Sequence, residues 1–186
     1  MSDKVKRDWS TQPESRESSE SVRSNEESES WGLKVASESD VESTLARLTD
    51  HLNDQQRAAF RVKLQRYVRK PDRELILAVD GGQVLGLVCV IMQMELPANF
   101  TYEQADHLRN FAFGSQLLVH PDVRNQGIGA SLHLRSLQWA REQGRAGHWL
   151  ITHRLSDWYR RQFGYEEIGR IKKKGVDKIL MLKEFK

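Results

Sequence analysis

Two glycines at the start of a predicted helix are the residues that most clearly suit chemistry. Residues 117–130 read LLVHPDVRNQGIGA, in which an apolar run gives way to a polar loop that leads into Gly127 and Gly129. Free N–H groups at a helix N-terminus point at one spot, and the helix dipole adds about half a positive charge there. Glycine lets a diphosphate approach the backbone, and Arg124 adds a charge-assisted contact, so the segment predicts an anion-binding site.

The spacing disfavours two common phosphate-binding loops. A P-loop places Lys and Ser or Thr straight after its last glycine, but Ile128 and Ala130 follow the glycines here. A dinucleotide fingerprint needs a third glycine, whereas Leu132 stands three positions after Gly129. Taken alone, the two glycines are equally consistent with a tight turn.

Strands and helices alternate on both sides of this loop. Period-2 and β-rich runs predict strands at 31–36, 75–79, 84–94, 111–119, 148–152, 165–169 and 178–182. Helical periodicity predicts helices from Ser39 to Leu52 and over 54–69, 127–143 and 156–162, with a loop or short helix at 97–110. This order predicts an α/β (α+β) domain built on one central sheet with helices on its faces.

Several local details accompany these elements. Ser39 and Glu42 match a capping box, Ser156 matches a helix cap, and Asp80-Gly81-Gly82 is a strong hairpin turn. The helix at 127–143 is expected to turn five apolar residues inward: Ile128, Leu132, Leu134, Leu137 and Ala140.

The first 30 residues differ from the rest of the 186-residue chain. They hold nine Ser and six Glu with a net charge of −3, whereas the whole chain carries +3. Such a segment cannot bury enough apolar surface to offset its ordering entropy. We therefore expect a disordered tail at 1–30 and one domain at 31–186, whose net charge is +6.

Composition excludes several classes of protein. No apolar run approaches the ~20 residues that span a bilayer, and the N-terminus lacks an apolar signal-peptide core. Cys89 is the single cysteine and lies in an apolar run, so we expect a buried thiol and no intrachain disulfide. The six histidines show no metal-ligand spacing. These features favour a cytoplasmic location, with no metal and no membrane partner.

The glycine loop and its flanks resemble a known family. The pattern RxxGxGA at 124–130, preceded by VHPD at 119–122, resembles the acetyl-CoA signature of the GNAT superfamily of N-acetyltransferases. The resemblance continues through WAREQG at 139–144 and FGYEEIGR at 163–170, and it is strongest over 114–170.

The resemblance implies a fold, a co-substrate and a reaction. The implied fold is a mixed, mostly antiparallel sheet with about four helices, splayed between the strands at 111–119 and 148–152. The implied reaction moves an acetyl group from acetyl-CoA to a primary amine by direct attack in a ternary complex. Family members bind CoA through the loop amides and the preceding strand. The corresponding residues are Leu117, Leu118, Val119, Arg124, Asn125, Gln126, Gly127, Ile128, Gly129 and Ala130.

Tyr159 is the implied general acid for the departing thiolate. The common family pattern has three residues between this tyrosine and a glycine, but four stand between Tyr159 and Gly164. A strict count places Arg160 in the tyrosine position, and one residue turns a helical side chain by about 100°. Either the helix carries a bulge or starts differently, or Tyr159 packs beside its neighbours instead.

The base is less clearly marked, because residues 111–119 contain no carboxylate. His153 is a candidate at the end of the facing strand, since imidazole titrates near neutral pH. His120 is an alternative, although a His-Pro pair more often shapes a turn, and a water chain is another. A backbone N–H near the strand end, such as that of Val119, is a candidate donor to the oxyanion.

Other functions stay open at this stage. A non-catalytic acyl-CoA-binding sensor on the same fold is the main alternative, because the strand carboxylate is missing and the tyrosine is shifted. An adaptor that uses the tail and the basic hairpin around Lys172-Lys173-Lys174 is another. The expected acceptor is a small-molecule or protein amine. No nucleic-acid motif is present, and neither the acceptor nor the oligomeric state is predicted.

Overall fold

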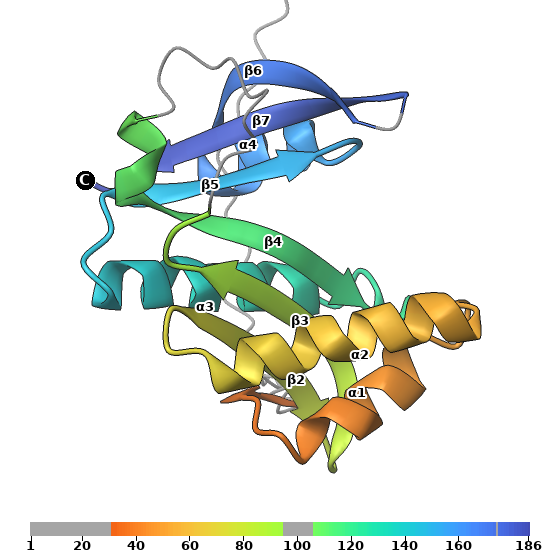
Figure 1. Ribbon diagram of the computed structural model, residues 1–186. Helices are drawn as coiled ribbons and strands as arrows, with labels where there is room; N and C mark the ends of the chain where they lie inside the picture. Colours follow the sequence, from red (N-terminus) through yellow and green to blue (C-terminus); the bar gives the residue numbers. More distant parts are fainter. Residues whose placement is uncertain (1–30, 95–105, 174) are drawn as a thin grey trace, which may run out of the picture.

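The computed structural model describes residues 31–94, 106–173 and 175–186. The predicted tail, most of the predicted 97–110 loop and Lys174 lie outside the described residues. Seven strands form one sheet in the order β1-β2-β3-β4-β5-β7-β6 (Figure 1). All neighbours are antiparallel except β4 and β5, which are parallel. The predicted mixed, mostly antiparallel sheet is therefore confirmed.

The element bounds agree with the predicted order. The strands are β1 (Gly32–Val35), β2 (Arg73–Asp80), β3 (Gln83–Ile91), β4 (Phe111–Val119), β5 (Gly147–Thr152), β6 (Glu166–Lys173) and β7 (Val176–Glu184). The α-helices are α1 (Asp40–Leu48), α2 (Asp54–Arg69), α3 (Ile128–Glu142) and α4 (Ser156–Phe163). Two 3-10 turns, η1 (His107–Asn110) and η2 (Pro121–Val123), flank β4.

Helices cover both faces of the sheet, because successive side chains of a strand point to opposite faces. On β2, Leu75 and Leu77 pack under α1 and α2, whereas Ile76 and Ala78 pack against α3. Figure 1 shows α2 in front of the sheet and α3 behind it. Side chains of α4 join one from α3 and Met181 of β7 in a further cluster. The helices α3 and α4 therefore pack against each other on the same side of the sheet.

The β2–β3 hairpin turns at the predicted site. Gly81 and Gly82 have φ angles of 52° and 85°. Two consecutive left-handed residues match the twist of the flanking strands, and glycine adopts that conformation without steric cost.

The predicted capping box of α1 is wrong. Ser39 has helical angles and its side chain makes no cap hydrogen bond. The Asp40 carboxylate accepts the Ser37 N–H at 2.8 Å instead, so the hydrogen bond at this helix start runs from the first helical residue back to a residue that precedes the helix. A capping box does begin α2, where Asn53 Oδ1 accepts the Gln56 N–H at 2.9 Å and the Gln56 side chain accepts in return.

Three further helix details differ from the sequence expectation. The first helix ends at Leu48, before Leu52. Leu134 of α3 is 55% exposed, because it lies about 200° around the helix from Leu132. Ser156 is the first helical residue of α4, and the residue before it occupies the N-cap.

The two halves of the sheet meet where β4 and β5 pair, over Phe111–Gly114 and Gly147–Leu150. The contact is close at Gly147. A Cβ atom placed there would lie 2.2 Å from the Lys183 carbonyl oxygen and 2.4 Å from the ring of Phe111. The junction therefore requires a glycine.

We predict that Gly147→Ala destabilises the fold by about 1–3 kcal/mol or more, because backbone and ring atoms must move to admit the methyl group. Urea unfolding measures the loss. Gly32→Ala is the matched control, since no atom lies within 4 Å of a Cβ there. Equal stability of the two variants would contradict the tight junction.

Candidate active site

The strands β4 and β5 diverge after Gly114 and Leu150, so the predicted splay is confirmed. The cause is a β-bulge, because the pairing with β3 skips from Gly114 to Gln116 and leaves Ser115 as the extra residue. A bulge bends its strand and increases the local twist. Beyond Ser115, β4 no longer pairs with β5 and a gap opens as far as Val119.

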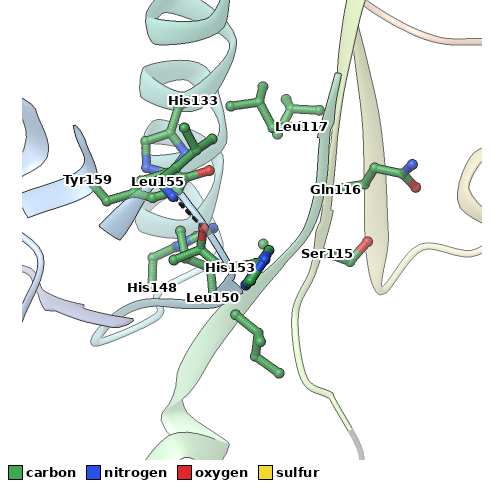
Figure 2. Close-up of a pocket in the computed structure, with 13 residues that line it drawn as sticks. Ser115, Gln116, Leu117, His133, His148, Leu150, His153, Leu155 and Tyr159 are labelled. Carbon is green, nitrogen blue, oxygen red and sulfur yellow. Dashed lines mark hydrogen bonds between the residues drawn. The ribbon is translucent and has the colours of Figure 1, made fainter. Parts of the chain in front are cut away.

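A cavity of about 190 Å³ lies in this gap. Figure 2 shows His133, His148 and Tyr159 on one side of β4, while Ser115 and Gln116 point away on the other. The cavity is lined by Val88, Gly114, Ser115, Gln116, Leu117, His133, His148, Leu150, Ile151, Thr152, His153, Leu155 and Tyr159.

Side chains of α2 hold the far side of the bulge. Lys63 Nζ donates to Gln116 Oε1 at 2.6 Å, and the hydroxyls of Tyr67 and Ser115 are hydrogen-bonded. Burial raises the pKa of Tyr67 well above its ordinary value, so its hydroxyl stays protonated at neutral pH. The gap therefore has two chemically different sides, one lined by α3 and α4 and the other by α2.

The hydrogen-bonding pattern of β4 turns the backbone groups of alternate residues toward the gap. The His120 N–H donates to the Leu85 carbonyl at 2.8 Å, and alternate residues of an antiparallel strand bond to the same neighbour. Leu118 therefore also bonds to β3. Leu117 and Val119 turn their N–H and C=O groups toward the gap, in the plane where β5 has diverged.

The N-terminus of α3 is open to a ligand. Gly127 is its N-cap with φ 80°, and Asn125 also has a positive φ of 65°. Among the described residues, no acceptor is recorded for the N–H groups of Ile128, Gly129 and Ala130. The Ile128 side chain is 1% exposed and anchors this first turn in the core. Three backbone donors are thus fixed at one place.

Packing of the chain does not itself demand glycine at position 129. A Cβ there would meet only Val119 Cγ2, at an ordinary 3.5 Å. The missing side chain leaves the helix start accessible to a bulky anion. Arg124 Nε donates to the Val119 carbonyl at 3.3 Å, which holds its guanidinium at the rim of the same loop.

Tyr159 faces the cavity from α4. It is 6% exposed, and its ring contacts His133 edge-on at 5.1 Å between centroids. Burial raises the pKa of Tyr159 to about 12, so the hydroxyl stays protonated at neutral pH. Arg160 is exposed and pairs with Asp157 at 2.6 Å, so it does not take the place of the tyrosine.

The helix α4 ends regularly in a left-handed glycine cap, with no bulge before Gly164. The Gly164 N–H reaches the carbonyls of both Arg160 and Tyr159, and the Tyr165 N–H reaches that of Tyr159 at 3.4 Å. Gly164 has φ 69°, which ends the helix in a left-handed cap. The shifted spacing is thus compatible with Tyr159 lining the cavity.

The two candidate bases differ in their surroundings. His153 Nδ1 lies 3.0 Å from the Asp177 carbonyl oxygen. A carbonyl only accepts, so Nδ1 donates this hydrogen bond, and in the neutral imidazole Nε2 carries the lone pair. His120 Nδ1 instead accepts the Asp122 N–H at 3.3 Å and shapes the turn η2.

Sequence reasoning missed two cavity residues, His133 and His148. Both are buried, at 2% and 0% exposure, and burial lowers the pKa of each, that of His133 to about 3. His148 Nδ1 and the Tyr165 hydroxyl are 2.6 Å apart. The sequence signal available was weak, since a lone histidine on an otherwise apolar face is usually a packing residue.

Other chemistry has less support in the described part of the chain. Cys89 is fully buried as expected, and burial raises the pKa of its thiol to about 12. Within residues 31–94, 106–173 and 175–186, His, Cys, Asp and Glu side chains form no group of three suited to a metal ion. None of the helices described is both long and apolar enough to cross a bilayer.

Comparison with known proteins identifies relatives of this fold. The sequence model of the acetyltransferase (GNAT) family matches residues 41–165. A search of curated proteins found no match. A putative acetyltransferase of the GNAT family from Desulfovibrio desulfuricans has a similar structure, with a TM-score of 0.62 and 13% identity. That comparison covers 83% of this chain and 98% of the other.

Two similar structures were solved with ligands. The PaiA N-acetyltransferase from Thermoplasma acidophilum, in complex with coenzyme A, has a TM-score of 0.60 and 15% identity over 84% of this chain and 99% of that one. A putative streptothricin acetyltransferase from Bacillus anthracis, in complex with acetyl coenzyme A, has a TM-score of 0.52 and 19% identity, covering 66% and 68%. Because the family match covers well over half of the sequence, and the sheet order and splay agree with it, the chain belongs to the acetyltransferase (GNAT) family.

Proposed function

We propose that this protein transfers an acetyl group from acetyl-CoA to a primary amine by direct attack in a ternary complex. Family membership supports acyl transfer, and two similar structures hold CoA or acetyl-CoA. The observation that carries the proposal is the open N-terminus of α3, which lies beside the end of β4, since a Cβ on Gly129 would be 3.5 Å from Val119 Cγ2.

The loop suits a diphosphate. The N–H groups from Gln126 to Ala130 and the helix dipole provide convergent donors and partial positive charge. Arg124 and Asn125 stand at the rim, where the Arg124 guanidinium adds a charge-assisted contact. The Val119 N–H and the Leu117 carbonyl suit the two amides of pantetheine, which leaves the Leu117 N–H free, whereas Leu118 is engaged with β3.

The length of the pantetheine arm locates the thioester. About twelve bonds separate its phosphate oxygen from its sulfur, roughly the extended backbone of four residues. With the phosphate at the level of Val119, four residues back along β4 lead to Ser115. The sulfur therefore lies near Ser115, where β4 and β5 begin to converge. The carbonyl then lies nearer to Leu117 than to Val119. We accordingly assign the Leu117 N–H as the oxyanion donor in place of Val119.

The acceptor enters from the opposite side, over α2 and the bulge. A lysine-type amine has a pKa of about 10.4, so its neutral form costs roughly 4–5 kcal/mol at pH 7. His153 Nε2, with its lone pair beside the cavity, is the proposed base that takes the amine proton. The new bond joins the amine nitrogen to the acetyl carbon.

Tyr159 is the proposed general acid. As the bond between carbon and sulfur breaks, its hydroxyl donates a proton to the thiolate. Its raised pKa keeps the proton in place until then. Tyr159 lines the cavity, where its side chain is available to a leaving group. The net reaction moves one proton from the amine to the thiol.

The loop proposal predicts that Gly129→Val weakens CoA binding by about a hundredfold or more. The side chain covers the amides that would hold the diphosphate. Calorimetric titration with CoA measures the change. Leu134→Gln, on the exposed face of the same helix, is the control and keeps wild-type affinity. Retained affinity in the valine variant, with the fold intact, would remove this loop from the proposal.

The acid proposal predicts that Tyr159→Phe lowers kcat by roughly 10²–10⁴-fold while the Kd for acetyl-CoA stays within about twofold. A thiol-release assay across a panel of primary amines gives kcat, and calorimetry gives Kd. Unchanged turnover would assign the proton to another donor. A wild-type chain that binds acetyl-CoA but releases no thiol with any amine would instead support the acyl-CoA-binding module.

A further inference from the structure

Two buried histidines form one end of the cavity. His133 comes from α3 and His148 from β5, and their ring centroids lie 5.5 Å apart in an edge-on arrangement. The Nε2 atom of each is buried and has no hydrogen-bond partner among the described residues. Buried polar atoms in proteins are normally satisfied, so these nitrogens call for a partner inside the cavity.

The tautomer of His148 follows from its neighbour. Tyr165 is 1% exposed, and within the described part of the chain its hydroxyl has one hydrogen-bond partner, His148 Nδ1. If Nδ1 donated, the hydroxyl proton would stay buried without an acceptor. The hydroxyl therefore donates, Nδ1 accepts, and Nε2 carries an N–H that is a free donor. Both imidazoles are neutral because burial lowers their pKa values.

The His148 ring lies over the convergence of the two strands. A Cβ at Gly114 would come within 2.5 Å of His148 Cε1 and 3.0 Å of its Nε2. Glycine at this position is thus what admits the imidazole to the base of the gap. The arm length given above brings the sulfur to the level of Ser115, next to Gly114. The cavity continues from this level to the two histidines, so it is the space open to an acyl group on that sulfur.

We propose that His133 and His148 form a polar floor that makes the site selective for acetyl over longer apolar acyl groups. This inference rests on the proposed function, because its ligand is an acyl-CoA thioester. An acetyl group is short enough to leave the two nitrogens uncovered, with space for hydrogen-bonded water. A butyryl chain covers them and offers no hydrogen bond in return. The neighbouring side chains of Val88 and Leu150 are apolar, so polarity of the floor rather than of the walls provides the discrimination.

Binding measurements test this without knowledge of the acceptor. The full chain is titrated calorimetrically with acetyl-CoA and with butyryl-CoA, and the ratio of the two Kd values is compared among variants. We expect wild type to prefer acetyl-CoA by about tenfold or more, the effect of leaving a buried donor unpaired. His133→Leu should reduce that preference by about tenfold, through tighter butyryl-CoA binding. His133→Gln, of similar size but still polar, should keep the wild-type preference.

A second variant removes the polar group that β5 contributes to the cavity. His148→Leu combined with Tyr165→Phe deletes both partners of one hydrogen bond, so neither is left unpaired, and it should reduce the preference as His133→Leu does. Equal wild-type affinity for the two thioesters would overturn the inference, and so would the same ratio change in the Leu and Gln variants of His133. Failure of wild type to bind either thioester would instead overturn the proposed function. Thermal unfolding verifies that each variant is folded.

Discussion

The site depends on one constraint, namely that β4 and β5 pair over only four residues each. The two strands are held together by close packing at Gly147. This residue lies so close to the Lys183 carbonyl and the Phe111 ring that no methyl group fits there. Divergence is set by the extra residue of the bulge, Ser115. A parallel pair held together at one end and bent apart at the other leaves backbone donors and acceptors exposed along the edge of β4. The cavity is the consequence of that geometry.

Residues far apart in sequence reach this gap because the helices stand on fixed sides of it. The first turn of α3 is anchored through Ile128, which orients the free amides at the wide end. Tyr159 is held by its neighbours in the aromatic cluster beside α3, nearer the narrow end. The far side is bordered by α2, where Lys63 donates a hydrogen bond to Gln116. The proposed sites of anion binding and of proton transfer are thereby separated along the length of one strand.

Most of the fold was predictable, because it depends on period and turn chemistry. The alternation in β2 and β3 and the Gly81-Gly82 turn led to a hairpin that the structure confirms. Capping was less predictable, since Ser39 and Asn53 both suit an N-cap and only tertiary context selects between them. The splay itself came from family resemblance, because nothing in the residue type of Ser115 marks a bulge.

The inner face of α3 shows why the cavity floor was missed. Periodicity favoured Leu134, but the helix turns that side chain to solvent and buries His133 in its place. Residue type also argued against the two histidines, because a neutral buried imidazole is indistinguishable in sequence from an exposed one. Only the three-dimensional proximity of His133, His148 and Tyr165 shows the arrangement.

Buried polar atoms without partners at one end of a cavity are energetically unfavourable. This cost is relevant to the role of His133 and His148. Burying an imidazole nitrogen without a partner costs roughly 1–3 kcal/mol, and an apolar aromatic ring would make the same ring contacts without that cost. Leucine at position 133 would fill the same volume with no such cost. Histidine is therefore less favourable than leucine for packing alone. The unpartnered nitrogen lies where the thioester end of the ligand is expected. Conflicts between local stability and residue choice are typical of functional sites, which favours a role in binding over one in packing for His133 and His148.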